Sequence, residues 1–216
     1  MLRRIVENGR FEVEANEWGA VRLLSEAGLP FVAGSTLNVY NPETLGVLAG
    51  LGARRWLPPV EMSGAALAAL LAHAPTGIET EVFVYGRLPL AWSARCFTAR
   101  HYNLPKDDCQ FRCLDHPDGL PLASREGEAF LTLNGIQTQS AGVYNLIGEL
   151  LALRKLGVAS LRLSPQSHHM ARVVDAFQAA LAGDAHADLT RFMPGAPVDG
   201  YWHGRPGLEY GVQAPC

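Results

Sequence analysis

The chain has 216 residues, a length that fits one large domain or a tight pair of domains. Hydrophobic residues make up 48% of it and charged residues 18%, so the chain can bury a sizeable core, and this composition excludes an intrinsically disordered protein. The formal net charge is −3 and no polybasic tract is present, which argues against a dedicated nucleic-acid-binding protein.

The sequence predicts neither a membrane-spanning nor a secreted protein. No apolar run approaches the roughly 18–20 residues of a membrane span. Residues 1–7 carry charges but no apolar stretch of a signal peptide. Four cysteines are too few for a disulfide scaffold. We therefore expect a cytoplasmic protein whose cysteines serve as metal ligands or catalysts.

Short apolar runs alternate with amphipathic helical runs. Local signals mark the helix ends: Gly28 and Pro30 follow one helix, Asn41 caps a second helix that starts at Pro42, and Ser63 caps a third. Strands are expected at 11–15, 29–33, 54–57, 79–85 and 158–163. Helices are expected at 18–27, 42–51, 64–73, 141–156 and 168–182, and residues 2–8 as the end of a further helix.

Strand and helix alternation at this spacing predicts an α/β fold with a parallel sheet covered by helices. A complete (β/α)₈ barrel needs eight strands and about 250 residues. We therefore expect a partial (β/α) TIM-type barrel over residues 1–216, a single domain that lacks the first part of the barrel. The alternative is a complete open α/β sheet of five strands.

Residues 88–140 break this alternation. They are rich in turn-forming residues and hold three of the four cysteines. The segment lies between the fourth strand and its helix, at the carboxyl end of the strand, which is the end that carries the chemistry in barrel enzymes. We expect a cysteine-bearing insertion there.

Cys96, Cys109 and Cys113 form the pattern C-x₁₂-C-x₃-C. Cys109 and Cys113 are four apart, so one helical turn would place both thiolates on one side. Nearby Arg, Lys and His side chains favour the thiolate form, which binds metals. Such ligands suit Zn²⁺ or an iron–sulfur cluster, although three unconnected cysteines would show the same spacing.

Three thiolates are one ligand short of a closed zinc or iron–sulfur site. Cys216 is available, but as the last residue of a Pro/Gly-rich tail it is a poor candidate. His101 or His116 would complete a zinc site. A ligand from outside this chain is the remaining alternative.

The cysteines lie within runs that resemble a known family. Residues 81–100, EVFVYGRLPLAWSARCFTAR, resemble the U32 superfamily of collagenase-like proteins, and residues 104–113, LPKDDCQFRC, narrow the resemblance to its UbiV branch. The agreement covers essentially the whole chain. Further matching runs are residues 16–19, 31–41, 133–138, 144–146 and 158–166.

This resemblance implies a (β/α) barrel that carries a [4Fe–4S] cluster on four cysteines. Cys96, Cys109 and Cys113 match the last three ligands, and the first falls in a part of the barrel that this chain lacks. The resemblance further implies a heterodimer with a UbiU-type paralogue, a UbiT-type lipid carrier as accessory, and oxygen-independent hydroxylation of the ubiquinone precursor ring. A prephenate-like hydroxyl donor is implied for the superfamily, in which related proteins hydroxylate RNA bases.

A dicarboxylate donor would need cations at the mouth of the barrel. Arg87 and Arg95 flank the end of the fourth strand and are the candidates, because guanidinium groups match carboxylates. Glu61 follows the third strand, and Asn38 and Tyr40 follow the second, so each is a candidate substrate contact. Ion pairing, helix capping and loop stabilisation are the alternative roles. No catalytic residue is predicted.

Several other functions are alternatives to hydroxylation. The sequence has no G-x-S-x-G or H-E-x-x-H motif, so a peptidase is not expected. A structural zinc protein held by the three cysteines and one histidine is an alternative. So are a non-catalytic electron-transfer or scaffold subunit and an RNA-hydroxylating relative, although the acidic balance argues against RNA binding.

Overall fold

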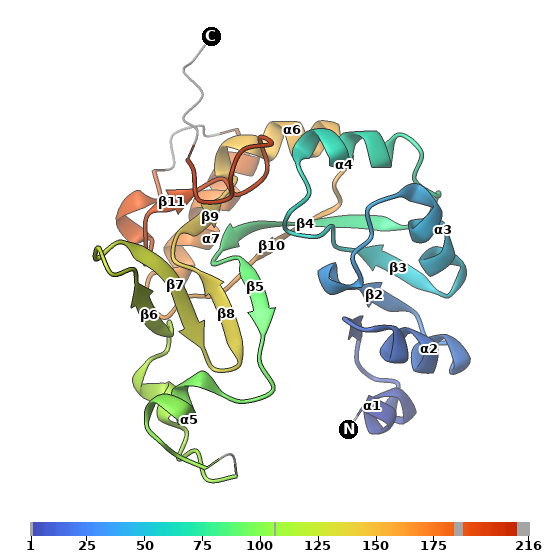
Figure 1. The fold of residues 1–216 in the computed structure, drawn as a ribbon. Coiled ribbons are helices and arrows are strands. Elements are labelled where there is room, and N and C mark those ends of the chain that lie inside the picture. The colour runs from blue at the N-terminus through green and yellow to red at the C-terminus, as the bar shows by residue number, and fades with distance from the viewer. Residues whose placement is uncertain (1, 106, 184–187, 211–216) are drawn as a thin grey trace. The chain divides into compact units, whose positions relative to one another are not determined.

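The computed structural model describes residues 2–105, 107–183 and 188–210, and the chain divides into two compact units. The first unit comprises Met1–Phe83, Leu151–Arg162 and Tyr201–Pro206. The second comprises Val84–Leu150, Leu163–Gly200 and Gly207–Cys216. Figure 1 follows the chain by colour, and each unit is described by itself below.

The first unit is built on parallel strands. Its strands are β1 (Glu14–Ala15), β2 (Phe31–Ala33), β3 (Ala53–Trp56), most of β4 (Glu79–Gly86) and most of β10 (Ser160–Leu163). β1, β2, β3 and β4 pair in that order and in parallel. β10 pairs with β4, and the bonds Ala159 N–Thr80 O and Ser164 N–Tyr85 O advance in the same direction, as in a parallel pair. All five predicted strands are therefore present, and the predicted α/β fold with parallel strands is confirmed.

Helices alternate with these strands, and all but the last of them lie at the predicted places. They are α1 (Leu2–Asn8), α2 (Trp18–Glu26), α3 (Pro42–Gly50), α4 (Gly64–Leu71) and α6 (Leu150–Lys155), with the short 3₁₀ helix η1 (Ser35–Leu37) after β2. The predicted caps form: Asn41 Oδ1 accepts a hydrogen bond from Thr44 N at 2.7 Å, and Ser63 Oγ accepts one from Ala66 N at 3.2 Å. The core of the unit consists of fully buried apolar side chains, among them Leu24, Phe31, Leu45, Leu48, Trp56 and Leu67.

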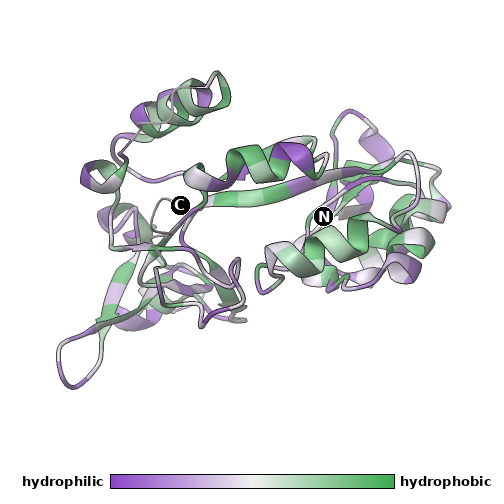
Figure 2. Cartoon of the chain, turned by 90° about the horizontal axis from the view of Figure 1, so that it is seen from above, coloured by the Kyte–Doolittle hydropathy of each residue, from purple (hydrophilic) through white to green (hydrophobic). Residues whose placement is uncertain are grey.

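A network of ion pairs joins the strands of the first unit. Arg162 of β10 contacts Glu14 of β1 at 2.6 Å and Glu81 of β4 at 2.6 Å. Arg55 of β3 contacts Glu81 at 3.6 Å and Glu79 at 2.7 Å. Figure 2 shows β4 passing from hydrophilic at its first residues, where this network forms, to hydrophobic over the rest.

The pair Glu14–Arg162 shows that the sheet is strongly curved. β1 and β10 lie at opposite ends of the order β1-β2-β3-β4-β10, four strand spacings apart, which is about 19 Å in a flat sheet. Two side chains cannot meet across that distance, so their contact requires the strands to bend around the charged face. Within the part of the chain that is described, no strand pairs with the outer edge of β1, so no closed barrel is found.

The second unit contains two sets of strands. The end of β4 pairs antiparallel with β9 (Val143–Asn145), which pairs parallel with β11 (Pro197–Val198). A separate antiparallel sheet, in the order β5-β8-β7-β6, lies in the expected insertion at residues 88–140. Its strands are β5 (Pro89–Trp92), β6 (Leu120–Ala123), β7 (Ala129–Asn134) and β8 (Gln137–Ser140). The helices of the unit are α5 (Phe97–His101), α7 (Met170–Leu181) and the 3₁₀ helices η2 (Arg112–Asp115), η3 (Ile147–Glu149) and η4 (Thr190–Phe192).

The helix predicted at 141–156 is wrong over its first half. Val143 and Tyr144 are strand residues paired with β11, and Asn145 Oδ1 accepts a hydrogen bond from Ile147 N at 3.1 Å, which starts a turn. Only Leu150–Lys155 is α-helical. The helical spacing of the leucines led to the wrong prediction, because Leu146 and Leu153, each 1% exposed, are buried on different elements and not on one helix face.

No helix in the described part of the chain is long and apolar enough to cross a bilayer.

The ion-pair network generates a test of stability. Replacing Arg162 by Met leaves Glu81, whose side chain is 9% exposed, with only the longer contact to Arg55. We expect a loss of about 1–3 kcal/mol in the free energy of unfolding, less than for a fully buried pair because solvent reaches Arg162. Urea unfolding measures it. Arg22→Met breaks the exposed pair with Glu26 and should cause no measurable change. Equal effects of the two substitutions would contradict the assigned importance of the network.

Candidate functional site

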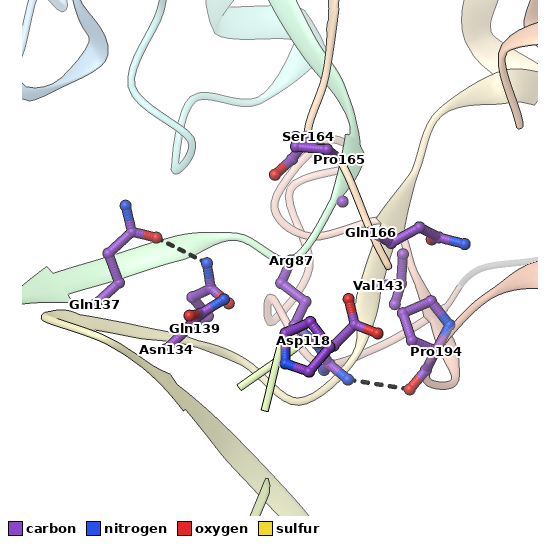
Figure 3. Close-up of a pocket in the computed structure, with 12 residues that line it drawn as sticks. Arg87, Asp118, Asn134, Gln137, Gln139, Val143, Ser164, Pro165, Gln166 and Pro194 are labelled. Carbon is purple, nitrogen blue, oxygen red and sulfur yellow. Dashed lines mark hydrogen bonds between the residues drawn. The ribbon is translucent and has the colours of Figure 1, made fainter. Parts of the chain in front are cut away.

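A pocket of about 270 Å³ lies in the second unit, where β4 and β10 end. β4 ends at Gly86 and β10 at Leu163, and parallel strands bring their carboxyl ends to the same edge of a sheet. Arg87 and Ser164 follow them directly and line the pocket (Figure 3). The remaining lining residues are Gly86, Pro117, Asp118, Asn134, Gln137, Gln139, Val143, Pro165, Gln166 and Pro194.

One wall of the pocket is fixed by a buried tyrosine. The Tyr85 hydroxyl donates to Gln166 Oε1 at 2.7 Å, and Gln166 Nε2 donates to the carbonyls of His168 at 2.6 Å and Phe192 at 2.7 Å. Tyr85 is fully buried, and its ring meets Phe177 of α7 edge-on at 5.9 Å. Burial raises the pKa of Tyr85 to about 12, so the hydroxyl keeps its proton and remains a donor. The amide of Gln166 is thereby held in one orientation.

Arg87 is anchored to the backbone of two loops. Its Nη1 donates to the carbonyls of Ser140, at 3.0 Å, and Ala141, and its Nη2 donates to that of Pro194 at 3.0 Å (Figure 3). Burial lowers the pKa of Arg87, and the charge of Asp118 opposes that shift. The predicted substrate contact therefore lines the pocket, but its terminal nitrogens hold the pocket wall together.

The rest of the lining is rich in amides. Asn134, Gln137 and Gln139 come from the β7–β8 hairpin, and Gln139 Nε2 donates to Gln137 Oε1 at 2.7 Å (Figure 3). Asp118 accepts hydrogen bonds from the backbone N, at 2.7 Å, and the hydroxyl of Ser167. The pocket therefore offers a ligand both donors and acceptors, with one cation and one carboxylate. Sequence reasoning missed these amides, and the alternation that puts Gln137 and Gln139 on one face of a strand was the available signal.

Two of the cysteines are linked to this lining by backbone hydrogen bonds. Cys96 precedes α5, where Phe97 N donates to Gly135 O at 2.7 Å in the turn between Asn134 and Gln137. Cys113 lies in η2, and His116 N donates to its carbonyl at 3.1 Å directly before Pro117 and Asp118. Cys96 and Cys113 are therefore close, along the chain and its backbone hydrogen bonds, to residues that line the pocket.

The three thiols fit an iron–sulfur or zinc site by their chemistry but are not gathered into one. Each is half-buried and free of disulfide bonds. In the part of the chain that the structure describes, no group of three or more His, Cys, Asp or Glu side chains is placed to hold a metal ion. The predicted helical turn from Cys109 to Cys113 is wrong, because Gln110 and Phe111 are both left-handed, with φ of 51° and 50°. Cys216 lies outside the described residues.

The two histidines predicted as zinc ligands have other contacts. His116 Nε2 lies 2.7 Å from the Tyr102 hydroxyl, and the two rings are stacked. His101 meets the Tyr102 ring edge-on at 5.0 Å. The Arg112 guanidinium lies over the same ring at 5.5 Å from its centroid. An aromatic cluster with one cation therefore includes the residue directly before Cys113 in the chain.

The other predicted site residues do not line this pocket. Arg95 is exposed and follows β5, because a separate strand intervenes after β4. Asn38, Tyr40 and Glu61 belong to the first unit and follow β2 and β3, as predicted. Asn38 is left-handed at the end of η1. Partial burial, and secondly the charge of Glu61, raise the pKa of Tyr40, so Glu61 lies near enough to act on the Tyr40 hydroxyl.

The anchoring of Arg87 is testable by stability. Arg87→Met leaves the carbonyls of Ser140, Ala141 and Pro194 without their donor, and we expect the free energy of unfolding to fall by about 2–4 kcal/mol. The exposed Arg95 is the matched control, and Arg95→Met should change it by less than about 0.5 kcal/mol. Chemical unfolding of both variants checks this. An Arg87→Met protein as stable as the parent would contradict the anchoring role of Arg87.

The raised pKa of Tyr85 predicts a loss of stability at high pH. The folded-state pKa of about 12 exceeds the unfolded value of about 10, so the stabilisation is fully present below pH 10. It is lost as the pH rises from about 10 to about 12. Unfolding free energies measured across this range should fall, and more steeply in the parent than in Tyr85→Phe. A slope unchanged by the substitution would show that Tyr85 does not titrate differently in the folded state.

Comparison with known proteins identifies the family. A sequence model of peptidase family U32 matches residues 1–192. No solved structure matches the chain. The matched region includes β4, the cysteine segment and all but one of the residues that line the pocket, the exception being Pro194. The chain belongs to peptidase family U32.

Proposed function

We propose that this chain is an iron–sulfur subunit that supports oxygen-independent hydroxylation of the ubiquinone precursor ring, and that it belongs to the UbiV branch of family U32. The observation that carries the proposal is the position of the cysteines. One inserted segment supplies Cys96, Cys109 and Cys113 as well as the amides and Asp118 of a polar pocket. In this proposal, the same inserted segment would carry the redox group and supply part of the substrate pocket.

The pocket's own residues have defined tasks in this proposal. Asn134, Gln137 and Gln139 orient hydroxyl and carbonyl groups of a ligand by hydrogen bonds. Arg87 gives the lining a positive charge, which would favour the carboxylates of a prephenate-like hydroxyl donor. Gln166, fixed by Tyr85, keeps the opposite wall rigid. Arg95, Asn38, Tyr40 and Glu61 remain proposed substrate contacts outside this pocket.

The three thiolates would hold a [4Fe–4S] cluster, which supplies one-electron chemistry when bound. They leave one cluster position to a ligand that the described residues do not provide. We propose a UbiU-type paralogue as heterodimer partner and a UbiT-type lipid carrier as accessory, in the cytoplasm. No motif of a peptidase supports proteolysis.

We also propose that the curved parallel sheet is part of a (β/α) barrel. Two features support this: β1, β2, β3, β4 and β10 are neighbours in chain order, and the contact of Glu14 with Arg162 requires curvature of the barrel type. The pocket at the carboxyl ends of β4 and β10 is where such barrels place their ligands.

Metal analysis tests the proposal. The full chain, purified without oxygen, should contain about four iron and four acid-labile sulfide per chain. Cys109→Ala should lose both, because a cluster ligand is removed. Cys216→Ala is the control from the same chain and should keep them.

The alternatives give different results in the same experiment. One zinc per chain without sulfide would overturn the cluster in favour of a structural zinc site. Iron and sulfide that survive in Cys96→Ala, Cys109→Ala and Cys113→Ala alike would remove the ligand assignment. A folded, metal-free protein, both alone and with a UbiU-type partner, would overturn the proposed iron–sulfur role.

A further inference from the structure

A second cavity, in the first unit, is unrelated to the proposed hydroxylation site. It is a groove of about 550 Å³ between the start of α4, the end of α6 and the loop after Gly200. Its lining is mainly apolar and small. The lining residues are Ser63, Gly64, Ala65, Ala68, Ala152, Lys155, Leu156, Trp202, His203 and Gly204. Such a size and lining are typical of a site for a small organic ligand.

Trp202 forms a fixed wall of this groove. It is only 7% exposed, and its carbonyl accepts a hydrogen bond from Gly64 N at 2.9 Å. The indole lies so close to α4 that a Cβ at Gly64 would stand 2.8 Å from Trp202 Cε2. Glycine at this position therefore lets the ring lie against the helix backbone, and the groove is preformed rather than made by side-chain movement.

The charge in the groove is positive. Lys155 is the single formally charged side chain among the described lining residues, and within the described part of the chain it forms no ion pair. A ligand that fits has an apolar body against Ala68, Ala152 and Trp202 and one anionic group at Lys155.

We propose that this groove binds a small monoanionic amphiphile, an apolar molecule with one carboxylate, which pairs with Lys155. The apolar body would be held by burial against the two helices and Trp202. The carboxylate would form a charge-assisted hydrogen bond to the ammonium group. This proposal does not depend on the proposed function, because none of its residues lines the pocket beside the cysteines.

Calorimetric titration of the full chain with dodecanoate, kept below its critical micelle concentration, tests the proposal. We expect saturable binding of one molecule per chain. Dodecanol should bind about tenfold more weakly, because it lacks the charge. Butyrate should not bind measurably, because it buries too little apolar surface.

Three variants assign the binding to the groove. Lys155→Gln should weaken dodecanoate binding about tenfold. Arg154→Gln, the adjacent exposed base on α6 that does not line the groove, should leave it unchanged. Ala152→Phe, at an exposed position that tolerates a larger side chain, should fill the groove and abolish binding. Binding that is absent in the parent, appears only with micelles, or survives both Lys155→Gln and Ala152→Phe would overturn the proposal.

Discussion

Arg162 and its two carboxylates form the interaction on which the first unit depends. Placing a guanidinium and two glutamates over a sheet costs desolvation energy, which is offset only when the charges meet at short range. Arg162 meets Glu14 and Glu81, each at 2.6 Å, and Arg55 completes the neutralisation of Glu81. Because Glu14 and Arg162 come from the two outermost strands, these contacts exist only while the sheet is curved. The charged face and the curvature therefore stabilise each other.

The second unit uses fixed polar groups in a different way. Tyr85 lies near the end of β4 and Arg87 directly follows the strand, and both use side-chain donors to bind distant parts of the chain. Tyr85 orients Gln166, and Arg87 holds the carbonyls of Ser140, Ala141 and Pro194. The bonds to Ser140 and Ala141 are partly buried, where a carbonyl without a donor is costly, so they restrict where these parts of the chain can lie. The amides of the pocket are thus presented by a scaffold that is already rigid before a ligand binds.

Elements with local signals could be predicted from the sequence, and elements set by distant pairing could not. The helices capped by Asn41 and Ser63 were found because each cap bonds its own first turn. The antiparallel sheet at residues 88–140 was missed, because its two edge strands, β5 and β6, are mostly exposed and show weak apolar alternation. Its pairing also joins residues as far apart as Pro89 and Gln139. The amide lining of the pocket follows from that pairing and was missed with it.

The cysteine segment shows the same division between composition and geometry. Residue type alone pointed to thiolate ligands, whereas their arrangement depends on the backbone between them. Gln110 and Phe111 are left-handed, and Phe111 and Leu114 expose 71% and 78% of their surface. A backbone that keeps large apolar side chains in water beside Cys113 gains little from its own packing. Thiolate–metal bonds are strong enough to drive local folding, so the proposed cluster would stabilise a segment that buries little of its own apolar surface.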